Sequence, residues 1–358
     1  MTLPAAVVGL LARLPKVELH LHLDGSLRPA TAFELGLARG VLGPATTVAG
    51  VGARLRAPMP CRDQAELLAA FDLPLAILQD TEALERASAE LVEDVAGDGT
   101  IYAEVRWAPA LHTTQGLSDR QVIAAVAGGA RRGMSRVAAG GGAIEVRLIA
   151  VAMRTHAPAR NEAVARAAVA AAGDGVVGFD LAGPEAASPD PLAHRRAFGI
   201  ARAGGLGISV HAGEWGGAKQ VRRALALDPA RIAHGAPAVD DPALMAELRG
   251  RAVTLDLCPT SNWQAGLVPR LADHPLPRLL RAGVPVTLST DDRTVSDLTL
   301  PREYERALEP LGLSVGELWA MDRHALEAAF LAHEPQTRER LRAAMTVFEA
   351  QEPLPREG

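Results

Sequence analysis

Short apolar runs rich in β-branched residues alternate along this chain with stretches in which Ala, Leu, Arg and Glu recur at helical spacing. The short runs predict buried strands, and the stretches between them predict amphipathic helices. Strands separated by helices form βα units around a parallel sheet. The strand candidates are 17–22, 101–107, 144–152, 176–181, 207–211, 231–233, 252–258 and 286–290.

The number of these units bears on the architecture. Eight strand candidates in 358 residues favour one domain over 1–358, an α/β fold of the closed (β/α)8 TIM-barrel type. An open, doubly wound sheet is the alternative that the same pattern allows. Helices are predicted over 81–96, 191–203 and 241–249, and the chain from 301 onward is helical in character, which predicts C-terminal helices outside the barrel.

One connection is much longer than the others. About 75 residues separate Gly25 from Ile101, whereas βα loops usually have 2–6. The segment 26–100 contains helical patterns, so we expect a helical insertion after the first strand. An excursion of this kind above a strand end is a natural lid.

Composition narrows the classes of function. Lys plus Arg is 37 and Asp plus Glu is 42, which gives a net charge of −5 and no basic patch for a nucleic acid. No segment approaches the ~20 apolar residues that span a bilayer. The two cysteines, Cys61 and Cys258, form no disulfide framework and fit a reducing compartment, so we expect a cytoplasmic protein. Nothing in the pattern indicates an oligomeric state.

Side chains with catalytic potential stand where four strand candidates end. His20 and His22 end the first, and because residues i and i+2 of a strand point to one side, both imidazoles reach one spot. Taken singly, each group has a plainer interpretation, either as a structural histidine or as an acid that caps a helix. The other groups are His211 with Glu214 after the fifth strand, His234 after the sixth, and Asp291 with Asp292 after the eighth.

The shared position of these groups favours a metal centre. Barrel enzymes build their sites at the carboxyl ends of the strands. Three neutral imidazoles and one carboxylate suit Zn²⁺, which lowers the pKa of a bound water to about 7 when a position is left open. A further histidine and a free glutamate supply proton transfer. The residues therefore predict metal-assisted hydrolysis and leave the substrate open.

Seven segments, in this order along the chain, resemble the adenosine deaminase family of the amidohydrolase group. The resemblance extends from residue 14 to about residue 304, and the order of all seven segments makes it specific. The segments are PKVELHLHLDG at 15–25, YAEVR at 102–106, DLAG at 180–183, HAGE at 211–214, HG at 234–235, CPTSN at 258–262 and TDD at 290–292.

This resemblance implies an enzyme that hydrolyses adenosine and 2′-deoxyadenosine to inosines and ammonia in purine salvage. It implies that Glu214 protonates purine N1 as hydroxide attacks C6, and that His234 orients the water and stabilises developing charge. It further implies one Zn²⁺ per chain, ligated by His20, His22, His211 and Asp291.

The resemblance also implies a set of contacts to a purine nucleoside. Asp24 would bind the ribose, the backbone N–H of Gly183 would reach N3, and Asp292 would hydrogen-bond N7. An apolar gate within the insertion would be lined by Leu67, Leu68 and Phe71, for which helix core is the simpler interpretation. Trp215, and Arg293 where animal members often have Pro, are departures that bear on this pocket.

Other functions stay open at this point. Sister enzymes deaminate adenine, 6-amino-6-deoxyfutalosine or N6-methyladenosine monophosphate, although adenine deaminases tend to have Ile-Glu-Gly where this chain has Leu-Asp-Gly at 23–25. A barrel that had become a binding protein would have lost a ligand or the acid. A phosphotriesterase-like binuclear hydrolase would need a bridging carboxylated lysine, and neither Lys16 nor Lys219 is placed for that.

Overall fold

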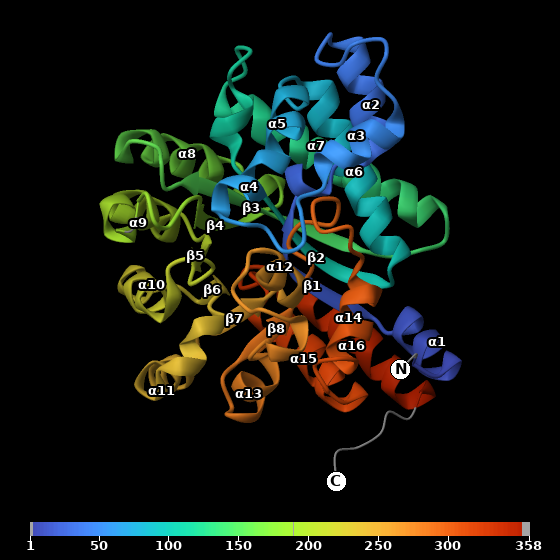
Figure 1. Ribbon diagram of the computed structural model, residues 1–358, viewed down its shortest axis with the longest axis vertical. Helices are drawn as coiled ribbons and strands as arrows, with labels where there is room; N and C mark the ends of the chain where they lie inside the picture. Colours follow the sequence, from blue (N-terminus) through green and yellow to red (C-terminus); the bar gives the residue numbers. More distant parts are fainter. Residues whose placement is uncertain (1–2, 189, 353–358) are drawn as a thin grey trace.

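The computed structural model describes residues 3–188 and 190–352, and at its centre stands an eight-stranded parallel barrel (Figure 1). The strands follow one another around the barrel in chain order. All eight predicted strands are confirmed, with ends shifted by at most two residues. They are β1 (Lys16–His22), β2 (Thr100–Trp107), β3 (Glu145–Met153), β4 (Val176–Ala182), β5 (Gly207–Ala212), β6 (Arg231–His234), β7 (Thr254–Leu257) and β8 (Val286–Leu288).

The barrel closes between β1 and the segment that follows β8. The backbone N–H of Asp291 donates to the carbonyl of His20 at 3.0 Å, and the N–H of His22 donates to the carbonyl of Asp291 at 2.8 Å. Leu21 and Asp291 pair as a parallel bridge. This closure excludes the open, doubly wound sheet, and it places the backbone of Asp291 between two histidines of β1.

The interior of the barrel holds paired charges beneath the strand ends. Arg106 lies 2.8 Å from Asp180, and Arg231 lies 3.0 Å from Asp256, with all four side chains fully buried. A buried charge without a partner would cost several kcal/mol, about 3–5 when one partner is removed. The pairing therefore lets charged residues occupy strands that otherwise bury Val, Leu, Ile and Ala.

Helices surround the barrel, and the predicted ones are confirmed. The predicted helix over 81–96 is α6 (Thr81–Gly97), and Asp80 caps it by accepting the N–H of Ala83 at 2.9 Å. The predicted helix over 191–203 begins as a 3-10 turn. The helices between strands are α6 (Thr81–Gly97), α7 (Asp119–Ala139), α8 (Pro158–Ala170), α9 (Arg195–Ala203), α10 (Gly217–Ala224), α11 (Pro242–Gly250), α12 (Pro259–Gln264) and α13 (Leu276–Arg281). Before β1 comes α1 (Ala5–Arg13), and after β8 come α14 (Leu300–Leu308), α15 (Val315–Ala328) and α16 (Pro335–Gln351).

The long connection after β1 has two parts. Its first part contains α2 (Pro29–Ala38), α3 (Val48–Leu55), α4 (Gln64–Leu68) and α5 (Asp72–Ile77), of which α4 lies nearest the barrel axis in Figure 1. Its second part is α6, which packs along α7 and against β2 as an ordinary barrel helix. The excursion proper thus ends before Thr81, and its role as a lid stays a prediction. No helix among the described residues is long and apolar enough to cross a membrane.

Candidate active site

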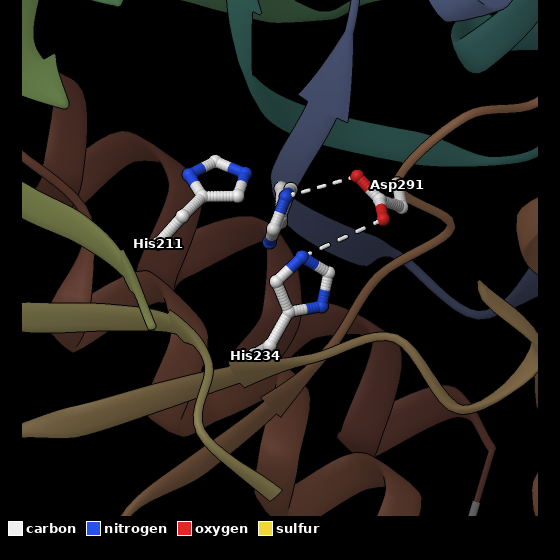
Figure 2. A group of neighbouring side chains, drawn as sticks. His211, His234 and Asp291 are labelled. Carbon is white, nitrogen blue, oxygen red and sulfur yellow. Dashed lines mark ion pairs between the residues drawn. The ribbon is translucent and has the colours of Figure 1, made fainter. Parts of the chain in front are cut away.

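The carboxyl ends of β1, β5 and β8 bring the four predicted metal ligands together. Nε2 of His20 lies 3.0 Å, and Nε2 of His22 lies 3.3 Å, from Oδ1 of Asp291. Nε2 of His22 and Nε2 of His211 are 3.2 Å apart. Ligands at zinc distances and tetrahedral angles are about 3.4 Å apart. Figure 2 shows His211 and Asp291 directed toward the same space, so these separations fit one ion.

At His20, His22 and Asp291 the shifts in pKa favour the protonation state that a metal requires. Burial lowers the pKa of His20 well below its usual value and that of His22 to about 3, so both imidazoles are neutral. Burial alone would raise the pKa of Asp291, but the imidazoles of His20 and His234 hold it well below the usual range. Nε2 of His20 is fully buried and satisfies no hydrogen bond within the described structure. A cation would fill this orphaned position.

Two further side chains orient the predicted ligands. The hydroxyl of Ser261 donates to Oδ2 of Asp291 at 2.7 Å, and Oδ2 of Asp180 lies 2.8 Å from Nδ1 of His211. Partners of this kind fix the rotamer of a ligand and the tautomer of an imidazole. Sequence reasoning gave Ser261 and Asp180 no role, although both stand at or just beyond the ends of strands, where the site was expected.

His234 is set slightly apart from the four predicted ligands. Its Nε2 is 3.7 Å from Oδ2 of Asp291 and 3.8 Å from Oε2 of Glu214, while its Nδ1 faces the amide of Asn262 at 3.1 Å. Burial lowers its pKa to about 4. The donor atoms of His20, His211, His234 and Asp291 also lie within 4.8 Å of one another, so proximity alone does not separate His234 from the ligands. The separations of 3.0–3.3 Å join His20, His22, His211 and Asp291 and do not involve His234.

Backbone strain marks two of these positions. His234 and Asp291 both have a φ of 67°, in the left-handed region that non-glycine residues rarely adopt. Such conformations cost on the order of 1–3 kcal/mol and cluster at functional sites. At both positions the left-handed φ turns the main chain at or after the end of a strand. The side chains of His234 and Asp291 then face each other (Figure 2).

A cavity of about 290 Å³ opens beside this cluster, and every predicted substrate-side residue lines it. Its apolar wall includes Leu75, Leu111, Val151 and Met153. At Gly183 the φ of 108° is one that an L side chain rarely adopts, which explains glycine at this point of the wall. The predicted residues around the cavity are Asp24, Leu67, Leu68, Phe71, Gly183, Glu214 and Asp292.

Asp24 reaches the cavity from a turn and not from β1. The strand ends at His22, and Asp24 begins a 3-10 turn, Asp24–Ser26, so it does not continue the alternation of the strand. Its Oδ1 accepts the N–H of Gly25 at 3.2 Å, so it also supports the turn. Burial raises the pKa of Asp24 to about 6.

Asp292 packs directly on Gly25. A Cβ atom on Gly25 would lie 1.7 Å from Oδ1 of Asp292, so only glycine fits there. Burial, together with the neighbouring Asp291 and Asp24, raises the pKa of Asp292 well above its usual value. The interpretation of the acid pair as a helix cap is wrong, since the next helix begins at Leu300 behind Thr299.

Glu214 stands in the turn after β5. Burial raises its pKa well above the usual value, and the negative charges of Asp291 and Glu185 act in the same direction. These effects favour the acid form of the carboxyl group. The interpretation of Glu214 as a helix cap is also wrong, because α10 begins at Gly217 and its N-cap residue is Gly216.

The predicted gate residues serve as cavity wall and as a small core at the same time. Leu67 is buried with Cys61 in a cluster against which Phe71 and Trp215 pack. Leu68, in contrast, is 38% exposed beside the cavity. Leu67 therefore belongs to a small core, and the role of these residues as a gate stays a prediction.

The two remaining features singled out in the sequence lie outside the cavity wall. Arg293 forms a largely buried ion pair of 2.6 Å with Asp98, which ties the loop after β8 to the turn before β2. Lys16 donates to the carbonyls of Leu14 and Asp98, and Lys219 is exposed on α10. Neither lysine contacts the histidine cluster, so neither is placed to bridge two metal ions.

The barrel, the His/Asp cluster at its strand ends and the buried acid beside it define a metal-centre hydrolase of the barrel class. The family model described as adenosine deaminase matches residues 15–345. The adenosine deaminase of Mycobacterium avium is 37% identical over 334 residues, which cover 88% of this chain and 90% of that protein. This chain belongs to the adenosine deaminase family.

Solved structures resemble the chain along its length. The Arabidopsis N6-mAMP deaminase is 28% identical with a TM-score of 0.82, and the match covers 95% of this chain and 99% of that one. A zinc-bound amidohydrolase from Burkholderia ambifaria is 24% identical with a TM-score of 0.86, covering 98% and 94%. The second likeness is one of fold alone.

Proposed function

We propose that this chain is a zinc-dependent enzyme that hydrolyses adenosine and 2′-deoxyadenosine to the corresponding inosines and ammonia. One observation carries the proposal. Two carboxyl groups whose pKa values are raised, those of Glu214 and Asp292, line the same cavity as the His/Asp cluster. A purine ring presents acceptors at N1 and N7, and a protonated carboxyl group is a donor that matches an acceptor.

The proposed metal site uses the four side chains with the shortest separations. We assign His20, His22, His211 and Asp291 as the ligands of one Zn²⁺ per chain, because three imidazole nitrogens and one carboxylate oxygen suit this ion. When bound, Zn²⁺ supplies a Lewis acid that generates a nucleophile from water at neutral pH. His234 lies slightly farther from Asp291 and is assigned to orient that water and stabilise the developing charge.

The proposed reaction uses the carboxyl groups in defined roles. Glu214 gives its proton to N1 while the oxygen of a water adds to C6, which turns the ring carbon tetrahedral, and one proton of that water returns to Glu214. The remaining hydroxyl proton of the adduct passes to the exocyclic nitrogen, the C6–N bond breaks, and ammonia leaves a carbonyl group at C6. Asp292 donates to N7 and the N–H of Gly183 faces N3, so the ring is held while these protons move.

The charge of the cavity wall favours an uncharged substrate. Within the described structure no arginine or lysine lines the cavity. A phosphate, or the carboxylate of 6-amino-6-deoxyfutalosine, would enter without the cation that normally binds such groups. This supports a nucleoside over both anionic alternatives. The wall contains five acidic side chains, those of Asp24, Asp72, Glu214, Asp291 and Asp292.

Asp24 supports a nucleoside over free adenine. It is 6% exposed and lines the cavity, so its carboxyl group can take a hydrogen-bond partner from a ligand there. A ribose hydroxyl supplies that partner, and adenine does not. The cavity of about 290 Å³ is at the small end of ligand pockets, which suits a nucleoside.

The proposal includes a cytoplasmic enzyme whose partner is a small molecule. Cys61 and Cys258 are free and buried, which fits a reducing compartment. A net charge of −5 gives no support for a nucleic-acid partner.

Ammonia release from a panel of substrates tests the proposed function. The panel is adenosine, 2′-deoxyadenosine, adenine, AMP and 6-amino-6-deoxyfutalosine, each with metal-loaded protein. We expect kcat/KM for the two neutral nucleosides to exceed the others by at least about a hundredfold. A preference for AMP or for 6-amino-6-deoxyfutalosine would overturn the nucleoside assignment. No ammonia from any of the five would overturn the deaminase itself.

A further inference from the structure

A buried carboxylate outside the cavity wall holds the turn that carries Glu214. Glu185 follows Gly183 by two residues in the connection after β4, and it is 1% exposed. Its Oε1 accepts the N–H of Gly213 at 2.7 Å, and its Oε2 accepts the N–H groups of Gly216 at 2.6 Å and Trp215 at 3.3 Å. Both carboxylate oxygens are thus used by one short turn.

The three donors bracket Glu214 in the chain. One precedes it and two follow it, so the main chain is fixed on both sides of the proposed acid. The packing is close, because a Cβ atom on Gly216 would lie 2.6 Å from Oε2 of Glu185. Gly213 adopts a φ of 84°, which lets the chain turn sharply at the end of β5.

A buried arginine also forms hydrogen bonds with the same two connections. Arg154, which follows β3, donates to the carbonyl of His211 at 2.7 Å and to that of Ser188 at 3.3 Å. Arg154 is 3% exposed. Glu185 therefore accepts N–H groups of the turn at 213–216, and Arg154 donates to the carbonyl of His211 just before this turn. The turn is thus hydrogen-bonded at both ends.

We propose that Glu185 is a positioning residue for proton transfer, which holds Glu214 at the depth where its carboxyl group meets purine N1. The inference rests on the proposed function. Glu185 is not part of the cavity wall, so it acts through the turn and not on the substrate. Through these hydrogen bonds it also links the segment after β4, which contains Gly183, to the turn that contains Glu214. The groups that we assign to N3 and N1 are therefore held by the same side chain.

Removal of the carboxylate leaves three buried or partly buried N–H groups without an acceptor. Water then competes for them, and the turn relaxes. A displacement of about 1 Å at a reacting group costs on the order of a hundredfold in rate. The metal ligand His211 lies within β5 and is expected to keep its place.

A double-mutant cycle tests this inference in the full-length, metal-loaded enzyme. The variants are Glu185→Ala, Glu185→Gln, Glu214→Gln and the double variant Glu185→Ala/Glu214→Gln. For Glu185→Ala we expect kcat for adenosine to fall about 10- to 100-fold, with KM within about threefold and one metal per chain. Glu185→Gln keeps one acceptor oxygen and is expected to lose less. In the Glu214→Gln background, Glu185→Ala should lower kcat less than about threefold, because there is no acid left to position.

Asp322→Asn is the matched control. Asp322 is also a buried carboxylate that accepts a backbone N–H, that of Val17 at 2.9 Å, but it stands near the start of β1, away from the cavity wall. We expect it to leave kcat within about twofold even if it lowers Tm. Equal losses from Glu185→Ala in both backgrounds, or losses that follow metal content, would overturn the inference, and Glu185→Gln keeps the test valid if the alanine variant does not fold. A wild type that releases no ammonia would contradict the proposed function instead.

Discussion

The hydroxyl of Ser261 donates a hydrogen bond of 2.7 Å to one oxygen of Asp291, and the other oxygen of Asp291 faces His20 and His22. Ser261 lies on α12, which follows β7, whereas Asp291 follows β8. The serine therefore sets the direction in which the carboxylate of the next unit points. We expect the proposed metal centre to depend on this contact as well as on its ligands.

Replacement of Ser261 by alanine should weaken metal binding while the fold persists. Loss of such an outer partner typically costs 10- to 100-fold in metal affinity. Competition with a chelator, followed by elemental analysis, measures it. Ser296→Ala is the control, because Ser296 is also buried and donates at 2.7 Å, but to Gln264. Equal metal retention in both variants would contradict the role of Ser261.

Glu214→Gln should keep the metal and lose activity. The amide cannot give a proton to N1, and a general acid typically contributes 10²–10⁴-fold. We expect kcat to fall at least about a hundredfold, with one metal per chain by elemental analysis. A variant that loses its metal and regains activity with added zinc would show that Glu214 is a ligand.

Asp24→Ala should reduce the preference for nucleosides more than it reduces metal content. Asp24 is the buried carboxyl group that we assign to a ribose hydroxyl, and sites of this type reject the analogue without the hydroxyl by up to ~10⁴. The ratio of kcat/KM for adenosine to that for adenine measures the effect, and adenine serves as the internal reference. An unchanged ratio would assign Asp24 to the turn with Gly25 alone.

Glu303 should make the folded state less stable as pH rises. On α14 it accepts the N–H of Thr260 at 2.8 Å, and burial raises its pKa from 4.5 to about 7. The folded state thus favours the protonated form of Glu303. The stabilisation that this residue contributes is complete below pH 4.5 and is lost as pH rises through about 7. The resulting change in the free energy of unfolding is on the order of 3 kcal/mol.

Glu303→Gln stays neutral throughout and should flatten this dependence. Thermal unfolding between pH 5 and pH 8 measures it, and the wild type should lose more Tm over this range than the variant. Glu339→Gln, on an exposed part of α16, is the control and should keep the wild-type slope. Parallel slopes for all three proteins would contradict the role of Glu303.

The strands could be located from the sequence because each is a short apolar run between helical stretches. The number of βα units favoured a closed barrel, but the backbone bonds between Asp291 and His20 that close it could not be located, because no local pattern encodes them. The same limit applies to α6, whose periodicity resembles that of the insertion and whose packing on α7 shows it to be a barrel helix. The turn that carries Asp24 could not be located either, because periodicity does not indicate where β1 ends.

Histidines and paired acids at strand ends are conspicuous by residue type, so the cluster could be predicted. Ser261, Asp180 and Glu185 could not, because a lone serine or acid has many ordinary uses. Their contacts join segments that are distant in the chain, as when Glu185 accepts the N–H of Gly213. Such partners can be recognised only in the folded structure, where the turns after neighbouring strands lie side by side.

Metal removal and reloading test the central claim most directly. Protein stripped with a chelator should release no measurable ammonia from adenosine, and one equivalent of Zn²⁺ per chain should restore kcat/KM to that of the untreated enzyme. Elemental analysis of the same samples gives the stoichiometry. Full activity with substantially less than one metal per chain would contradict the account.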